Sequence, residues 1–250
     1  MKLLLALRFL TTIPLPWGRE ASPEDVGRSL GYFPVVGIII GLILTGLNWL
    51  FGLFLPSAVV NILLIVSMVV ISGGLHLDGF IDTCDGIGKH KTPEERWRVM
   101  QDSRVGSFGV VGGVLLLLVK YISLNSLPES LLMITLVFIP VLSRWAMVYA
   151  VSVYSYAKPS GLGNVFKQGA SWQKLTIATF VALVVAVVLF PTLFPLIQLR
   201  GLAVMFGVWV ITVVMAAYLK RKFSGLTGDT YGAINEVAEV VVLIMILLLA

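Results

Sequence analysis

Three aspartates in one short stretch are the residues of this chain best suited to chemistry. The stretch reads GGLHLDGFIDTCDGIG and holds Asp78, Asp82 and Asp85. Offsets of four and three residues place the three carboxylates on one face of a helix. Like charges at this spacing repel, and more strongly where the dielectric falls below that of water. The pattern therefore predicts a bound cation, and carboxylate oxygens favour hard ions such as Mg²⁺.

Two glycines next to these aspartates, Gly79 and Gly86, support this interpretation. They remove side-chain bulk, so a ligand or another helix can approach the backbone. The alternative is a solvated acidic helix end that nearby basic residues neutralise, and the candidates for that role are Lys89, Lys91 and Arg96. We favour the metal site.

The next segment, TPEERWRVM, predicts a short helix. Thr92 is suited to the N-cap, Pro93 to the first position and Glu95 to the third, which together make a capping box. We expect Glu94 and Arg96 to lie on the surface of this helix, without a role in the site.

The sequence MQDSRVGSFG follows and leads into an apolar run. Asp102 and Arg104 lie close to the predicted membrane entry, next to Gly106, and we expect both to function in the site. Arginine suits bidentate contacts with phosphate oxygens. Arg104, and with weaker support Lys89 and Arg98, are therefore candidate phosphate ligands.

Two other places carry polar groups that composition does not explain. Arg144 lies inside the apolar run around VLSRWAM, where a charge predicts a functional role, and we expect it to pair with an aspartate or a substrate phosphate. The segment GLTGDTYGAINEVAEV holds Asp229, Asn235 and Glu236. A helix N-terminus, where acidic residues are favoured, would explain Glu236 but not Asp229 or Asn235.

The chain around these residues has the composition of a membrane protein. Hydrophobic residues make up 58% of the 250 residues and charged residues only 12%, with a mean hydropathy of +0.98. Soluble domains carry about 25% charged residues. The net charge of +5 is spread over short loops, which argues against nucleic-acid binding. One cysteine, Cys84, excludes a disulfide within the chain, and no His/Cys set has zinc-ligand spacing.

Six or seven runs are apolar enough to cross a bilayer, which takes about 20 residues. The sequence predicts spans at Phe33–Leu55, Ser57–Leu75, Gly106–Leu124, Leu131–Val153, Leu175–Leu196 and Gly201–Leu219, with a short seventh run at Val237–Ala250. Pairing them as hairpins places the Lys- and Arg-rich segments on one side, which the positive-inside rule assigns to the cytoplasm. The predicted fold is an all-α transmembrane bundle, a single domain over residues 1–250. The N-terminal stretch predicts a short interfacial or re-entrant helix.

Three motifs in this order, HLDGFIDTCDG, MQDSRVGSFG and LTGDTYGAINE, closely resemble cobalamin synthase, the adenosylcobinamide-GDP ribazoletransferase family. The resemblance runs from RFLTTIPLP to the last helix. It implies that adenosylcobinamide-GDP and α-ribazole, or its 5′-phosphate, combine to give adenosylcobalamin, or its 5′-phosphate, with release of GMP. It also implies Mg²⁺ as cofactor and a multi-pass protein of the inner membrane with its site facing the cytoplasm. The resemblance leaves open whether the protein forms a homo-oligomer.

The resemblance also suggests a role for each candidate residue. Asp78, Asp82 and Asp85 would hold Mg²⁺ on the diphosphate, and Asp85 or Asp102 would accept the proton of the attacking ribose hydroxyl. Arg104, Lys89 and Arg98 would contact phosphate oxygens. Asp229 and Asn235 would complete the metal or nucleotide site.

Two other functions fit parts of the pattern. The acidic motif is similar to that of the CDP-alcohol phosphotransferases, but their D-G-x-x-A-R pattern is absent, since Phe80, Ile81, Asp82 and Thr83 follow Gly79. A cation transporter would need acids near the middle of the bilayer on opposed helices. Here the acids lie at the predicted end of a span with arginines nearby, which suits phosphate better.

Overall fold

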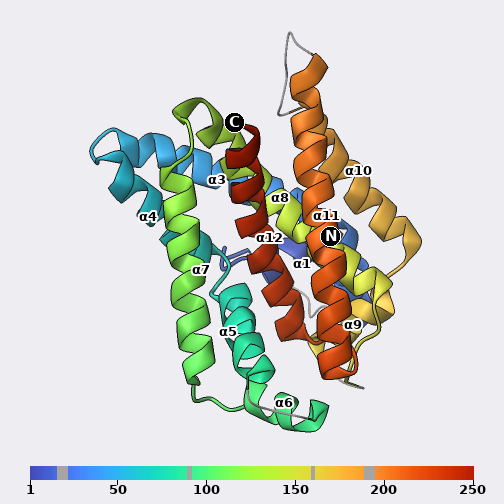
Figure 1. The fold of residues 1–250 in the computed structure, drawn as a ribbon. Helices are drawn as coiled ribbons and strands as arrows, with labels where there is room; N and C mark the ends of the chain where they lie inside the picture. Colours follow the sequence, from blue (N-terminus) through green and yellow to red (C-terminus); the bar gives the residue numbers. More distant parts are fainter. Residues whose placement is uncertain (16–21, 89–91, 159–160, 189–194) are drawn as a thin grey trace.

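The structure is a computed structural model that describes residues 1–15, 22–88, 92–158, 161–188 and 195–250, with the backbone alone of 195–198. Apart from turns, the described residues are helical, with a single β-bridge between Tyr156 and Leu226. The helices are α1 (Lys2–Leu10), α2 (Pro23–Arg28), α3 (Phe33–Gly52), α4 (Ser57–Ile71), α5 (Leu75–Ile87), α6 (Pro93–Met100), α7 (Ser107–Asn125), α8 (Glu129–Val153), α9 (Leu162–Gly169), α10 (Trp172–Val188), α11 (Pro195–Phe223) and α12 (Gly228–Leu249), with a 3₁₀ turn at Leu30–Tyr32 (Figure 1).

The described residues contain five helical stretches that are long and apolar enough to cross a membrane. They comprise α3 with the short helices before it, α7, α8, most of α11, and α12. Two bent pairs, α4 with α5 and α9 with α10, raise the number to seven if each pair is one span. The predicted all-α, polytopic bundle is therefore confirmed.

The predicted span Ser57–Leu75 is wrong as a single helix. The helix α4 ends at Ile71, and α5 starts at Leu75 after a bend of 89°. Gly73 and Gly74 form the break with φ of 62° and 71°, a left-handed backbone that glycine adopts without steric cost. The aspartates thus lie on a separate helix, and not on the tail of a straight span.

The bounds of the later spans also differ from those predicted. The helix expected at Leu175–Leu196 starts at Trp172 and ends at Val188, and residues 189–194 of that range lie outside the described residues. The last helix is 22 residues long instead of a short run from Val237, because it begins at Gly228. A capping box between Thr227 and Thr230 stabilises that early start. The polar residues of α12 therefore lie within a helix long enough to span.

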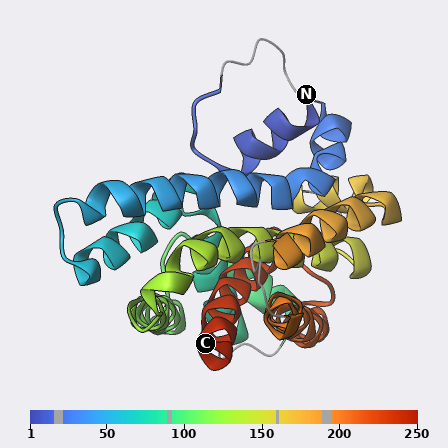
Figure 2. The same cartoon turned by 90° about the horizontal axis from the view of Figure 1, so that it is seen from above.

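The centre of the bundle is α8. Its most apolar part is 78% buried, the highest share among the five stretches. It runs beside α3, and the two cross the view of Figure 2, in which α7, α11 and α12 are seen nearly end-on. Two glycines allow the close approach: a Cβ on Gly37 would meet the Pro140 carbonyl oxygen at 2.5 Å, and one on Gly41 the Val137 Cα at 2.5 Å.

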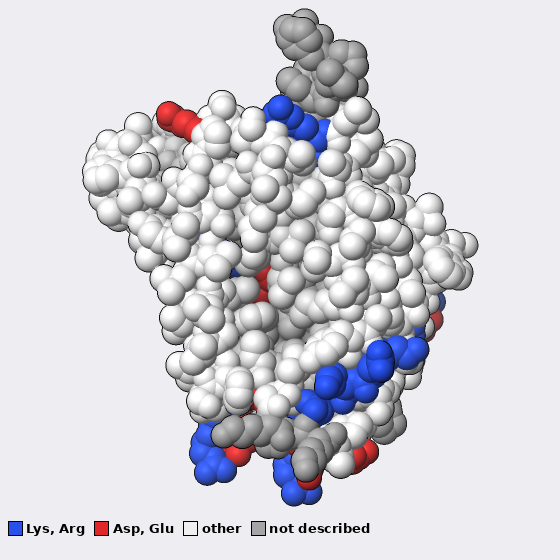
Figure 3. All heavy atoms as spheres, in the orientation of Figure 1, with Lys and Arg blue, Asp and Glu red and all other residues white. Residues whose placement is uncertain are grey.

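One end of the molecule collects the polar connections. The end of α5, the helix α6 and the starts of α7 and α12 all lie at the lower end of Figure 1. Charged side chains gather at that end in Figure 3, while most of the visible face above it is uncharged. The helix α1, with nine residues, is short, as predicted.

Candidate active site

The predicted acidic helix is confirmed as α5, and its three aspartates differ in exposure. Asp78 is exposed, Asp82 is half-buried and Asp85 is buried, so the row leads from the surface into the bundle. Neither the Asp78 carboxylate nor the Asp82 carboxylate has a hydrogen-bond or ion-pair partner among the described residues. Two of the three carboxylates are therefore available to a ligand.

A glycine contact brings Asp229, from the far end of the sequence, to this row. A Cβ on Gly79 of α5 would lie 2.7 Å from the carbonyl oxygen of Asp229, and one on Gly232 of α12 would lie 3.0 Å from that of His76. The two helices can approach this closely only without side chains at the contact. The first turn of α12 therefore lies directly against α5.

The result is a set of negative charges without balance. Asp82 lies in the electrostatic field of Asp78, Asp229 and Asp85, and the cation that acts on Asp229 is Lys158. As arranged, no group of three or more His, Cys, Asp or Glu side chains among the described residues could hold a metal ion. Mg²⁺ is commonly bound by only one or two carboxylates together with substrate phosphates. The donor set fits an ion that arrives with a phosphorylated ligand.

Asp85 has a different environment from its two neighbours. One carboxylate oxygen accepts a hydrogen bond from the backbone N–H of Gly106 at 2.7 Å, and the other from that of Gly109 at 2.8 Å. These are the free amides at the start of α7, which a carboxylate stabilises. Asp85 thus joins α5 to α7, and the absence of side chains at both glycines makes room for it.

The capping box predicted at Thr92 and Glu95 is confirmed, but the surface position predicted for Arg96 is wrong. Arg96 is buried, and its guanidinium donates hydrogen bonds to the carbonyl oxygens of Gly86 and Ile87 at 2.8 and 2.9 Å. The last carbonyls of a helix have no partner within it, so a cation there is favourable. Arg96 therefore fixes the end of the aspartate helix.

The other residues predicted around α6 lie at the surface. Asp102 and Arg104 form an exposed, two-pronged ion pair, with side-chain distances of 2.8 and 3.0 Å. This contact lowers the pKa of Asp102 to about 2, so its carboxylate is a weak base. Arg98 is exposed on α6, and Lys89 lies outside the described residues.

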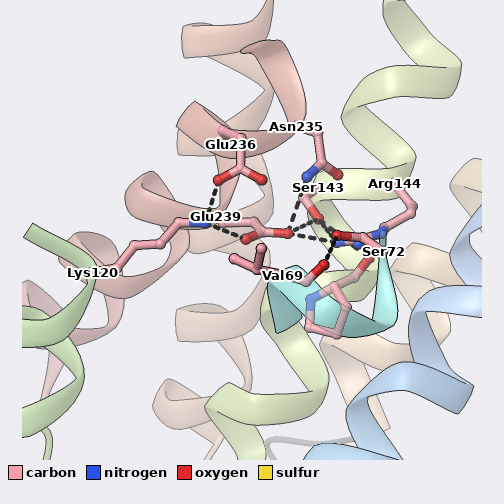
Figure 4. Close-up of polar contacts among 9 residues, drawn as sticks. Val69, Ser72, Lys120, Ser143, Arg144, Asn235, Glu236 and Glu239 are labelled. Carbon is pink, nitrogen blue, oxygen red and sulfur yellow. Dashed lines mark hydrogen bonds and ion pairs between the residues drawn. The ribbon is translucent and has the colours of Figure 1, made fainter. Parts of the chain in front are cut away.

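Arg144 and Asn235 belong to a second charged cluster, buried between α7, α8 and α12 (Figure 4). The Glu239 carboxylate forms ion pairs with Lys120 and with Arg144, each at 2.6 Å, and accepts a hydrogen bond from the Asn235 amide at 3.0 Å. Lys120 also forms an ion pair with Glu236 at 2.5 Å. Arg144 thus pairs with a glutamate and not, within the described residues, with an aspartate. The explanation of Glu236 by the helix N-terminus is also wrong, since its partner is Lys120. We call these residues the buried ion network.

Sequence reasoning missed two lysines. Lys120 is the single charged residue inside the apolar run of α7, a signal that should have marked it, as it marked Arg144. Lys158 gave no local signal, because it comes near Asp229 only through the folding of the loop after α8.

Together, fold and site define a multi-pass helical membrane protein with an open set of carboxylates at its polar end, a site suited to cations and phosphorylated ligands. The profile of the family described as cobalamin-5-phosphate synthase matches residues 2–247. The chain belongs to this family of transferases.

Curated relatives agree over nearly the full length. Proteins named adenosylcobinamide-GDP ribazoletransferase from Geotalea daltonii, Roseiflexus sp. and Desulforamulus reducens are 37%, 35% and 34% identical to this chain. The alignments cover 96%, 95% and 98% of this chain and 94%, 86% and 95% of the relatives. No solved structure matches the chain.

Proposed function

We propose that this protein joins adenosylcobinamide-GDP to α-ribazole, or to α-ribazole 5′-phosphate, and releases GMP. The proposal rests on the family and on one observation: the carboxylates of Asp78 and Asp82 on α5 have no partner among the described residues, and Asp229 of α12 lies against the same helix. Such a row at the polar end of a membrane bundle suits a diphosphate substrate that brings a divalent cation with it.

The reaction is the transfer of a substituted phosphoryl group. The ribose hydroxyl of the acceptor attacks the phosphorus on the cobinamide side of the diphosphate, and the bond from that phosphorus to the bridging oxygen breaks. The electron pair leaves with GMP, and the hydroxyl proton passes to a carboxylate. Asp82 is our candidate acceptor, because Asp85 already accepts two backbone hydrogen bonds and Asp102 is a weak base.

One or two of the carboxylates of Asp78, Asp82 and Asp229 would hold Mg²⁺ together with the diphosphate of the substrate. When bound, the ion neutralises charge on the diphosphate and makes GMP a better leaving group. Asp85 holds the start of α7 against α5, and Arg96 holds the end of α5, so both position the row. Lys158, whose charge acts on Asp229, is a candidate to contact phosphate, with Arg104, Arg98 and Lys89 as further ones.

The protein would lie in the inner membrane, with its polar end facing the cytoplasm. Basic residues in the described parts of the chain at this end include Arg96, Arg98, Arg104, Lys158, Lys220, Arg221 and Lys222. This is the distribution that the positive-inside rule describes.

Turnover by purified protein in detergent tests the proposal. Adenosylcobinamide-GDP and α-ribazole 5′-phosphate should give GMP and a corrinoid that carries the lower nucleotide, with Mg²⁺ but not with a chelator. A folded protein that releases no GMP would overturn the proposal, and CDP-activated alcohols would be the next substrates to try.

A further inference from the structure

A small pocket opens beside the aspartate row. It has a volume of about 120 Å³, and Asp78 and Asp229 form part of its wall. The rest comes from helices distant in the sequence, with mostly apolar side chains, among them Phe9, Phe33, Met147, Val151 and Phe166. Helices α1, α3, α8, α9 and α12 therefore meet around one space next to the candidate active site.

Three phenylalanines make one wall of this pocket. The ring centres of Phe9 and Phe166 lie 4.5 Å apart, those of Phe33 and Phe166 5.4 Å, and those of Phe9 and Phe33 5.9 Å. Phe33 and Phe166 are 1% and 3% exposed, so their rings are fixed by packing. Fixed aromatic faces favour a flat, apolar ligand.

Two buried polar side chains line the same pocket without a partner. His76 is 1% exposed and Tyr231 3%, and neither ring nitrogen of His76 nor the hydroxyl of Tyr231 has a hydrogen bond within the described residues. Buried polar groups are nearly always paired, because an unpaired one loses its hydrogen bonds to water without gaining others. A ligand in the pocket that offers a ring nitrogen or a hydroxyl would supply the missing partner.

We propose that this pocket binds the aromatic base of the acceptor, the benzimidazole of ribazole, and so directs its ribose towards the aspartate row. The inference rests on the proposed function. A cavity of roughly 150 Å³ takes a single benzene ring, and this pocket is slightly smaller at about 120 Å³. No more than one ring of the base would therefore enter, and the sugar would remain on the side of Asp78 and Asp229.

The other rings of the reaction fit less well. Guanine carries polar atoms around most of its edge and would leave several unpaired against the phenylalanine wall. The corrin ring is far larger than the pocket. The benzimidazole is flat and mostly apolar, and its free ring nitrogen can accept a hydrogen bond from Tyr231 or His76.

Direct binding of the free base tests the pocket apart from turnover. The probe is 5,6-dimethylbenzimidazole, titrated into the detergent-solubilised full chain and followed by saturation-transfer NMR. Val151→Phe fills the pocket and should abolish binding. The matched control is Val214→Phe on α11, at a position 61% exposed, which should bind as the wild type does.

A conservative variant guards against misfolding. Tyr231→Phe removes a single oxygen atom and should raise the KM for α-ribazole 5′-phosphate roughly 3- to 10-fold, the loss of one hydrogen bond. The kcat and the KM for adenosylcobinamide-GDP should stay unchanged. A structural defect would instead lower kcat or alter both KM values.

The two hypotheses fail differently. The pocket alone is overturned if the wild type turns over, Tyr231→Phe has the same KM for the acceptor as the wild type, and Val151→Phe still binds the base. Folded wild-type protein without turnover overturns the proposed function. Binding that Val151→Phe abolishes, together with the selective KM change, supports the pocket.

Discussion

Two groups of charged residues share α12 and follow opposite electrostatic rules. The first turn of the helix contributes Asp229 to the aspartate row, where negative charges lie together. Further along, Glu236 and Glu239 meet Lys120 and Arg144, so two acids face two bases. The buried ion network is balanced and enclosed, whereas the aspartate row is unbalanced and partly open.

The difference follows from the opposite charges that each region can reach. Charges in the interior have no water to stabilise them, so they persist only when paired. Lys120, Arg144 and Glu239 are all 4% exposed or less. The aspartate row can draw a cation from solvent or substrate, so its lack of balance is compatible with a stable fold. A cluster with balanced charge therefore indicates a structural role, and a cluster with unbalanced charge indicates a ligand site.

Removing one acid from each group should separate the two roles most clearly. Asp82→Asn should lower turnover by about 10²- to 10³-fold, the range for losing one strong electrostatic contact. Its thermal stability should equal or exceed that of the wild type, because a repelling charge is gone. Rates of GMP release and melting in detergent measure both, with Glu129→Gln at the other end of the bundle as control. Full activity in Asp82→Asn would sink the site assignment.

Glu239→Gln should have the opposite effect on stability. It leaves Lys120 and Arg144 buried with only Glu236, and breaking a buried ion pair costs about 3–5 kcal/mol. Unfolding in mixed micelles should show this loss. The double variant Lys120→Met with Glu236→Gln removes one charge of each sign and should lose less. Equal stability of Glu239→Gln and the wild type would contradict a structural role for the network.

A smaller effect is expected at the glycine contact between α5 and the first turn of α12. Gly79→Ala places a Cβ 2.7 Å from the Asp229 carbonyl oxygen, and overpacking of this kind costs about 1–3 kcal/mol. The variant should melt earlier and turn over more slowly, because α12 must move away from α5. Gly46→Ala on α3 is the matched control, since its Cβ meets nothing within 4 Å. Equal effects of both variants would show that the contact does not position Asp229.

The smallest effect is expected at the exposed pair. Arg104→Gln removes the contact that holds the pKa of Asp102 at about 2, so that pKa should rise towards the ordinary 3.8. Asp102 stays ionised above about pH 5 in either case, and the pH–rate profile in the neutral range should keep its shape. If the acid limb moved to higher pH instead, Asp102 would be the base, because a base with a raised pKa is protonated earlier.

Much of the candidate site could be predicted, because its signals are local. Spacing placed Asp78, Asp82 and Asp85 on one helix, and the capping box at Thr92 was read from four residues. The break before α5 was missed, although Gly73 and Gly74 lie side by side in the sequence. A glycine pair permits a left-handed turn but does not require one, so packing decides.

The membrane class, the all-α architecture and the acidic helix can be predicted from composition and from residues within a few turns of one another. Which acids are neutralised depends on the tertiary structure. Lys120 and Glu236 lie 116 positions apart, and Asp85 reaches the amides of Gly106 and Gly109 only across a helix contact. Such pairings depend on which helix faces meet, and local spacing does not encode this. That is why Asp85 and Asp82, three residues apart on the same helix, have different environments.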